Sequence, residues 1–188
     1  MIPAISLSGL LPPYFGASPT ISAECSPYEC TALEIAQSFA TTPERAKLLR
    51  GLLDYRKELL ALGFDGFQWV DGSFCEDVER VRGRPPGDID VVTVTARPAA
   101  VTDDDLRLLV ETRPELFRAE HAKKHFGCEA FFIDGSLPAR DVWRQVTYWF
   151  GLFSHQRETY QWKGILVVPM LSNDADAESY VASLGFVS

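Results

Sequence analysis

From Gly66 onward, short apolar runs alternate with longer segments in which apolar residues recur at helical spacing. The clearest run is 88–95, where Asp88 and Asp90 alternate with apolar residues before a valine-rich stretch that is typical of a strand. Thr102 is followed by three aspartates, which favour the positively polarised start of a helix. Further strands are predicted at 67–70, 128–133 and 163–168, and further helices at 114–127, 138–151 and 173–184.

The chain before Gly66 has a different pattern. Residues 1–25 are rich in proline, glycine and serine, which favours a segment extended along a surface over a helix. Ser26-Pro27-Tyr28-Glu29 has the spacing of a capping box and predicts a short helix through Phe39. Thr42-Pro43 predicts the start of a second helix, which Gly63 ends.

Strands that alternate with helices predict an α/β (α+β) fold, in which helices flank a small mixed sheet. We expect a single domain over 1–188, because neither an internal repeat nor a linker follows residue 30. Its expected parts are the extended segment 1–25, a helical part 26–63, a catalytic core 64–170 and a C-terminal helix 171–188.

The composition is that of a globular protein with an acidic surface. Hydrophobic residues make up 46% of the chain and charged residues 23%, and the formal net charge is −8. Duplex nucleic acid is usually bound through a basic surface. The charge therefore disfavours long nucleic acid and favours small molecules, metal-bound nucleotides and protein partners.

The four cysteines form no CxxC pair and have no histidine at zinc-finger spacing. A disulfide between Cys25 and Cys30 is conceivable, but no signal peptide precedes them to indicate an oxidising compartment. The longest apolar runs are far shorter than the ~20 residues of a membrane-spanning helix. We therefore expect no membrane association and a cytoplasmic location.

The strand at 88–95 carries the candidate chemistry. Side chains alternate across a strand, so Asp88 and Asp90 lie on one face and repel each other unless a cation lies between them. Mg²⁺ or Mn²⁺ suits such a pair, because Mg²⁺ binds one or two carboxylates together with phosphate oxygens. Glu129 on the next predicted strand is the candidate third carboxylate, and Asp134 is its alternative. Glu129 could instead lie at the sheet edge and pair with a lysine such as Lys123 or Lys124.

A phosphate-binding turn is predicted just upstream. Gly72 follows an apolar strand and lets a phosphate approach the backbone, while Ser73 adds a hydroxyl donor. Lys163, with Arg157 and His155, is a candidate for holding a triphosphate or a base, although the pattern favours a solvated turn for these three. Arg80, Arg82 and Arg84 could close over phosphates or form a basic loop without that role.

These motifs resemble the signature of the DNA polymerase beta-type nucleotidyltransferase superfamily. The resemblance rests on Trp69-Val-Asp-Gly-Ser73, on Gly87-Asp-Ile-Asp-Val91 and on Glu129, and the fourteen residues 74–87 form a slightly long spacer that predicts an inserted loop at 80–87. The chain is also similar to short bacterial nucleotidyltransferase-like proteins in Leu10-Leu-Pro-Pro13, Asp71-Gly-Ser-Phe74 and Lys163-Gly-Ile-Leu-Val167. The resemblance implies the fold and a site for a metal-bound nucleoside triphosphate.

The sequence hypothesis is a magnesium-dependent transferase that moves a nucleoside monophosphate from a triphosphate, with ATP expected, to a hydroxyl of a protein or small molecule. Asp88, Asp90 and Glu129 would bind metal and act in catalysis, and Gly72, Ser73 and Lys163 would bind nucleotide. The alternative is a weak or inactive binding module that acts through a partner, as an antitoxin or nucleotide sensor would in a toxin–antitoxin or phage-defence system. The nucleobase, the acceptor and the oligomeric state stay open.

Overall fold

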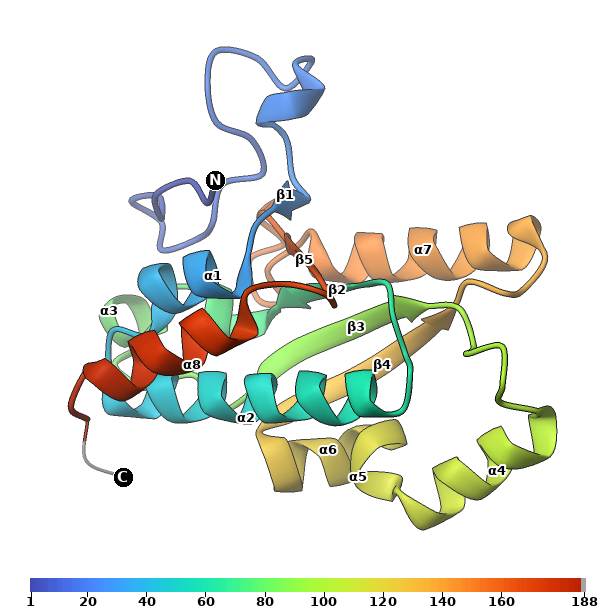
Figure 1. The fold of residues 1–188 in the computed structure, drawn as a ribbon. Helices are drawn as coiled ribbons and strands as arrows, with labels where there is room; N and C mark the ends of the chain where they lie inside the picture. Colours follow the sequence, from blue (N-terminus) through green and yellow to red (C-terminus); the bar gives the residue numbers. More distant parts are fainter. Residues whose placement is uncertain (187–188) are drawn as a thin grey trace.

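The computed structural model describes residues 1–186 and consists of one mixed β-sheet with helices on both sides (Figure 1). The strands are β1 (Tyr28–Glu29), β2 (Phe67–Asp71), β3 (Ile89–Thr95), β4 (Cys128–Asp134) and β5 (Leu166–Pro169). The helices are α1 (Ala32–Phe39), α2 (Pro43–Ala61), α3 (Val78–Arg82), α4 (Asp103–Thr112), α5 (Pro114–Phe117), α6 (Ala119–Phe126), α7 (Ala139–Phe153) and α8 (Asp174–Ser183). Two short 3₁₀ helices span Ser22–Glu24 and Gly72–Cys75.

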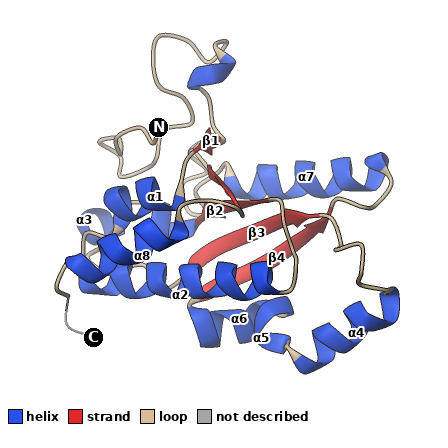
Figure 2. Cartoon of the chain, in the orientation of Figure 1, coloured by secondary structure: helices blue, strands red, loops and turns tan. Residues whose placement is uncertain are grey.

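The strand order in the sheet is β1-β5-β2-β3-β4. The outer pairs β1/β5 and β3/β4 are parallel, whereas the central pairs β5/β2 and β2/β3 are antiparallel. The α+β class predicted from the sequence is therefore confirmed (Figure 2). This topology places the end of β2 beside the start of β3, and the start of β3 beside the start of β4.

Alternation of side chains along the strands gives the sheet two apolar faces. One face, which includes Val70 and Val91, packs in the main core against α1, α2, α5, α6 and α8. The other face, which includes Trp69 and Val92, packs against Val146, Phe153 and other residues of α7. Asp88 and Asp90 alternate with Ile89 and Val91, so they belong to the face that α7 covers.

The predicted helix from Ser26 to Phe39 is wrong in its first half. Tyr28 and Glu29 form strand β1, because Tyr28 N–H donates to the Ile165 carbonyl and extends the sheet at β5. The Ser26 hydroxyl accepts a hydrogen bond from Ile165 N–H instead of capping a helix. The capping box lies further on, at Thr31 and Glu34, and the helix begins at Ala32.

Two other predicted helices differ at their ends. The helix predicted over 114–127 is divided into α5 and α6, because Arg118 between them has an extended backbone. The helix expected within 171–188 is α8, and it starts only at Asp174. Residues 187–188, the end of that predicted segment, lie outside the described residues.

The first residues of the chain pack on the sheet and on the turn after β2. Leu11 is fully buried and its carbonyl accepts a hydrogen bond from Gly164 N–H, just before β5. Leu10 forms an isolated bridge with Glu76, and the Gly9 carbonyl accepts from Asp77 N–H. The segment 1–25 is thus largely non-helical, as predicted, but part of it belongs to the core.

The cysteines and the helices bear on two sequence expectations. All four cysteines are free, so Cys25 and Cys30 form no disulfide. Burial raises the pKa of the Cys30 thiol to about 12. In the part of the chain that the structure describes, none of the helices combines the length and apolar character needed to cross a bilayer.

Replacing Gly51 with alanine should lower the free energy of unfolding by about 1–3 kcal/mol. A Cβ at Gly51 on α2 would overlap the Phe126 carbonyl oxygen at the end of α6, and that oxygen belongs to the backbone and cannot rotate away. Gly151→Ala on α7 is the matched control, since an added Cβ there has no neighbour within 4 Å. Urea denaturation should show Gly151→Ala unchanged or more stable, and equal stability of the two variants would contradict the close α2–α6 contact.

Candidate metal centre

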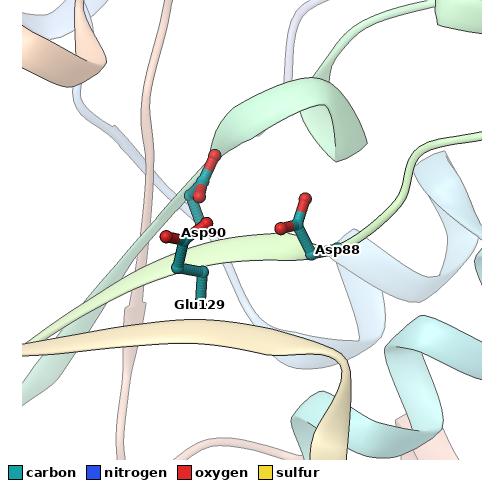
Figure 3. A group of neighbouring side chains, drawn as sticks. All are labelled: Asp88, Asp90 and Glu129. Carbon is teal, nitrogen blue, oxygen red and sulfur yellow. The ribbon is translucent and has the colours of Figure 1, made fainter. Parts of the chain in front are cut away.

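Three carboxylates converge where β3 and β4 begin. Asp88 directly precedes β3, Asp90 is its second residue, and Glu129 on β4 is the register partner of Asp90. One carboxylate oxygen from each residue lies within 4.8 Å of the corresponding oxygens of the other two. Figure 3 shows the side chains of this acidic triad on the same side of the two strands. The predicted grouping of Asp88, Asp90 and Glu129 is therefore present.

Asp90, on β3, lies between its register partners Asp71 on β2 and Glu129 on β4. Burial, with a further contribution from the neighbouring charges of Asp88 and Glu129, raises the pKa of Asp90 to about 6. A carboxylate that is desolvated and faces like charges is stabilised by a nearby cation. Because carboxylate oxygens are the ligands that hard divalent cations prefer, the acidic triad could hold a metal ion.

The register of β4 decides between the two candidates for the third acid. Glu129 lies opposite Asp90, whereas Asp134 lies opposite Thr95 at the far end of the same strand pair. Five residues of a strand span roughly 16 Å. Asp134 instead accepts a hydrogen bond from Ser136 N–H in the turn that follows β4. Glu129, not Asp134, thus belongs to the acidic triad.

The Gly72-Ser73 turn lies directly against the acidic triad. Asp71, the last residue of β2, is the register partner of Asp90, and Gly72 follows it with a φ of 81°. A Cβ at Gly72 would overlap the Asp90 carboxylate. Glycine is therefore needed for both the positive φ and the space, and Ser73 follows in the same 3₁₀ turn.

A buried ion network supports this turn from below. The Lys163 ammonium lies 3.1 Å from both Asp71 Oδ2 and Glu76 Oε1, and it donates to the Gly72 carbonyl at 3.4 Å. Glu76 also pairs with Arg82 at 3.3 Å. Lys163, predicted to bind nucleotide, is only 4% exposed and lies in this network beneath the turn. We call Asp71, Glu76 and Lys163 the buried charge network.

Asp71 was not among the predicted site residues. Burial raises its pKa to about 7, although the Lys163 ammonium acts in the opposite direction. Its Oδ1 atom is buried and has no hydrogen-bond partner in the described part of the chain. An acid inside an apolar strand, directly before the glycine of the turn, was the available sequence signal. An orphaned carboxylate oxygen beside Asp90 is a further feature that fits a cation nearby.

Lys123 on α6 also reaches the acidic triad. Its ammonium lies 2.5 Å from Asp88 Oδ2 and 3.3 Å from Glu129 Oε2. The hydrogen bond to Asp88 holds the pKa of Lys123 above its usual value. The sequence left open whether Glu129 joins a metal site or pairs with a lysine. In the structure Glu129 does pair with Lys123 while it belongs to the acidic triad.

The spacer between the turn and β3 is more ordered than predicted. The residues expected to start an inserted loop at 80–87 complete helix α3, because the Asp77 side chain caps its start and Gly83 ends it in a left-handed conformation. Arg80 pairs with Asp77, and Arg82 pairs with Glu76 and with Glu158. Arg80 and Arg82 are thus held by carboxylates of the chain itself.

The cluster predicted before the last strand is only partly assembled. Lys163 is buried, whereas His155 and Arg157 are exposed on the segment between α7 and β5. His155 Nδ1 is within hydrogen-bond distance of the Ser154 hydroxyl and the Gly151 carbonyl. Burial has the largest effect on the pKa of Asp90, and the charges of Lys163 and Arg157 act in the opposite direction.

Comparison with known proteins assigns a family. A model described as a family of unknown function, DUF6932, matches residues 3–169, so the chain belongs to this family. The matched range includes the acidic triad, the Gly72-Ser73 turn and the buried charge network. Neither the curated proteins nor the solved structures contain a match to the chain.

Proposed function

We propose that this member of the DUF6932 family is a metal-dependent nucleotidyltransferase, which moves a nucleoside monophosphate from a nucleoside triphosphate to a hydroxyl of a protein or small molecule. The observation that carries the proposal is the convergence of Asp88, Asp90 and Glu129 within 4.8 Å beside the Gly72-Ser73 turn. The same residues carry the sequence resemblance to the polymerase beta-type superfamily. We propose ATP as the donor.

The acidic triad suits Mg²⁺ or Mn²⁺, and Asp88, Asp90 and Glu129 would hold the ion. When bound, the ion would neutralise negative charge on the triphosphate and on the leaving pyrophosphate. Asp90 would be the central ligand, because it lies between its neighbours on β2 and β4. Its raised pKa shows that the ionised carboxylate is unfavourable at this position when no cation is bound.

The chain's own groups have distinct roles in the proposed transfer. Gly72 and Ser73 would bind the triphosphate, with backbone N–H groups and the Ser73 hydroxyl as donors. The acceptor oxygen forms a bond to the α-phosphorus, the bond from that phosphorus to the α–β bridging oxygen breaks, and pyrophosphate leaves with the electron pair. The Glu129 carboxylate would accept the proton of the acceptor hydroxyl.

Binding of a metal-bound triphosphate should raise the melting temperature. A ligand at 100 times its Kd adds about 2.7 kcal/mol, which is about 5–10 °C for a chain of this size. The test is a thermal-shift panel of the four ribonucleoside triphosphates with and without Mg²⁺. The shift should require Mg²⁺, should be largest for ATP, and should be lost in Asp88→Asn/Asp90→Asn.

The control for this panel is Asp54→Asn/Asp104→Asn, which removes the same formal charge at two exposed positions of α2 and α4. It should keep the shift of the wild-type protein. If no triphosphate shifts the wild-type protein, or if the shift survives in Asp88→Asn/Asp90→Asn, the proposed site is wrong.

A second candidate function is partner binding without efficient transfer, as in an antitoxin or nucleotide sensor. The observation that favours it is the pair of large exposed aromatic side chains on α7, where Trp143 is 73% exposed and Tyr148 is 63% exposed. Neither residue is among those of α7 that pack on the sheet. A protein that shows the Mg²⁺-dependent shift but releases no pyrophosphate with any hydroxyl acceptor supports this candidate.

A further inference from the structure

Lys123 is a cation already present among the proposed metal ligands. Its ammonium contacts Asp88 Oδ2 and Glu129 Oε2, which belong to two of the three residues of the acidic triad. An ammonium between two carboxylates gives part of the charge neutralisation that a divalent cation would give. Lys123 therefore occupies two of the three carboxylates that a metal ion would need.

The fold fixes the backbone of Lys123 and leaves its ammonium accessible. Ala122 and Phe126 bury the inner side of α6. The Lys123 carbonyl accepts the hydrogen bond of Gly127 N–H, which ends α6 just before β4. The Lys123 side chain is 49% exposed, so its ammonium can leave the carboxylates for water without disturbing the helix.

We propose that Lys123 is a built-in competitor of the divalent cation, so that metal binding requires its ammonium to leave Asp88 and Glu129. This inference rests on the proposed metal site and adds a control over its occupancy. The half-exposed ion pairs of Lys123 are individually weak, so a divalent ion with three carboxylate ligands displaces the ammonium at a moderate loss of affinity. Without the competing ammonium, the same carboxylates bind the metal more tightly.

The test is Mn²⁺ binding by the protein alone, measured by titration calorimetry and by the paramagnetic resonance signal of free Mn²⁺ at fixed ionic strength. Lys123→Met should lower the Kd for Mn²⁺ about tenfold, because it removes one positive charge beside the ligands. Lys123→Gln should act in the same direction, and the melting temperature of each variant shows that it is folded. The matched control is Lys124→Met, which removes the same charge from the next, exposed position of α6 and should change the Kd less than about twofold.

The outcomes separate this inference from the proposed function. An unchanged or weaker affinity in Lys123→Met overturns the competitor role, and so does an equal gain in Lys124→Met. In either case the metal site itself stands if the wild-type protein binds Mn²⁺ and Asp88→Asn/Asp90→Asn does not. Absence of Mn²⁺ binding in the wild-type protein and in both Lys123 variants overturns the competitor role and the metal site together.

Discussion

Asp90→Asn should weaken Mn²⁺ binding by at least about a hundredfold, which is more than the 10–100-fold typical of losing a group that only supports a ligand. The amide keeps the shape of the side chain but removes the charge of a carboxylate that is desolvated by burial. Asp134→Asn is the control, because it removes a charge from the same strand pair at the end away from the acidic triad. If Asp90→Asn binds Mn²⁺ within about threefold of the wild-type affinity, the acidic triad is not the metal site.

The same variant should be more stable than the wild-type protein when metal is removed with a chelator. The pKa of Asp90 is about 6 in the folded protein and near 3.8 when exposed, so the folded state binds the proton more tightly than the unfolded state. The ionised form therefore destabilises the metal-free protein, fully above about pH 6 and not below about pH 4. We expect Asp90→Asn to gain about 1–2 kcal/mol at pH 7.5 and nothing at pH 4, as measured by urea denaturation.

Lys163→Met should lower the free energy of unfolding by about 3–5 kcal/mol, the usual cost of breaking a buried ion pair from one side. The change leaves Asp71 and Glu76 buried, at 3% and 6% exposure, without the ammonium that both contact. For a chain of this size the melting temperature should fall by roughly 6–20 °C.

The control removes the charges of the two carboxylates together with that of the lysine. In Lys163→Met/Asp71→Asn/Glu76→Gln all three charges are removed, and the amides avoid the cost of isolated buried carboxylates. This triple variant should recover a large part of the lost stability. A Lys163→Met protein within about 1 kcal/mol of the wild type would mean that the buried charge network contributes little to the fold.

The fold class could be predicted because the apolar runs at β2, β3 and β4 are local signals with clear ends. The start of α1 was predicted wrongly because it depends on a long-range contact and not on a local signal. Ser26 and Glu29 have the spacing of a capping box, but Ile165, far along the chain, takes both the Ser26 hydroxyl and the Tyr28 N–H. The residues around Ser26 contain no signal for a pairing with a residue so far along the chain. Tertiary contacts therefore overrode the local helix preference.

The candidate site was predictable to the extent that it lies on neighbouring strands. Asp88 and Asp90 share a face by simple alternation, but the choice of Glu129 over Asp134 needed the register of β4 against β3. The role of Lys163 could not be predicted, because its partners Asp71 and Glu76 lie far from it in the sequence, at and just after the end of β2. The basic residues before β5 indicated a polar cluster, and only the fold shows that Lys163 is buried beneath the Gly72-Ser73 turn.

The connection of β1 and of residues 10–11 to the end of the sheet sets an order in which the protein can fold during synthesis. The Cys30 thiol and the Val167 carbonyl that accepts its hydrogen bond are separated by 137 positions. At about 5–20 residues per second, a ribosome needs roughly 7–27 s to make that stretch. Until then Leu11, which ends fully buried, has no β5 segment to pack against. β2, β3 and β4 are all synthesised earlier, so the three acids can come together on the growing chain before β5 is available to pair with β1 and to pack on Leu11.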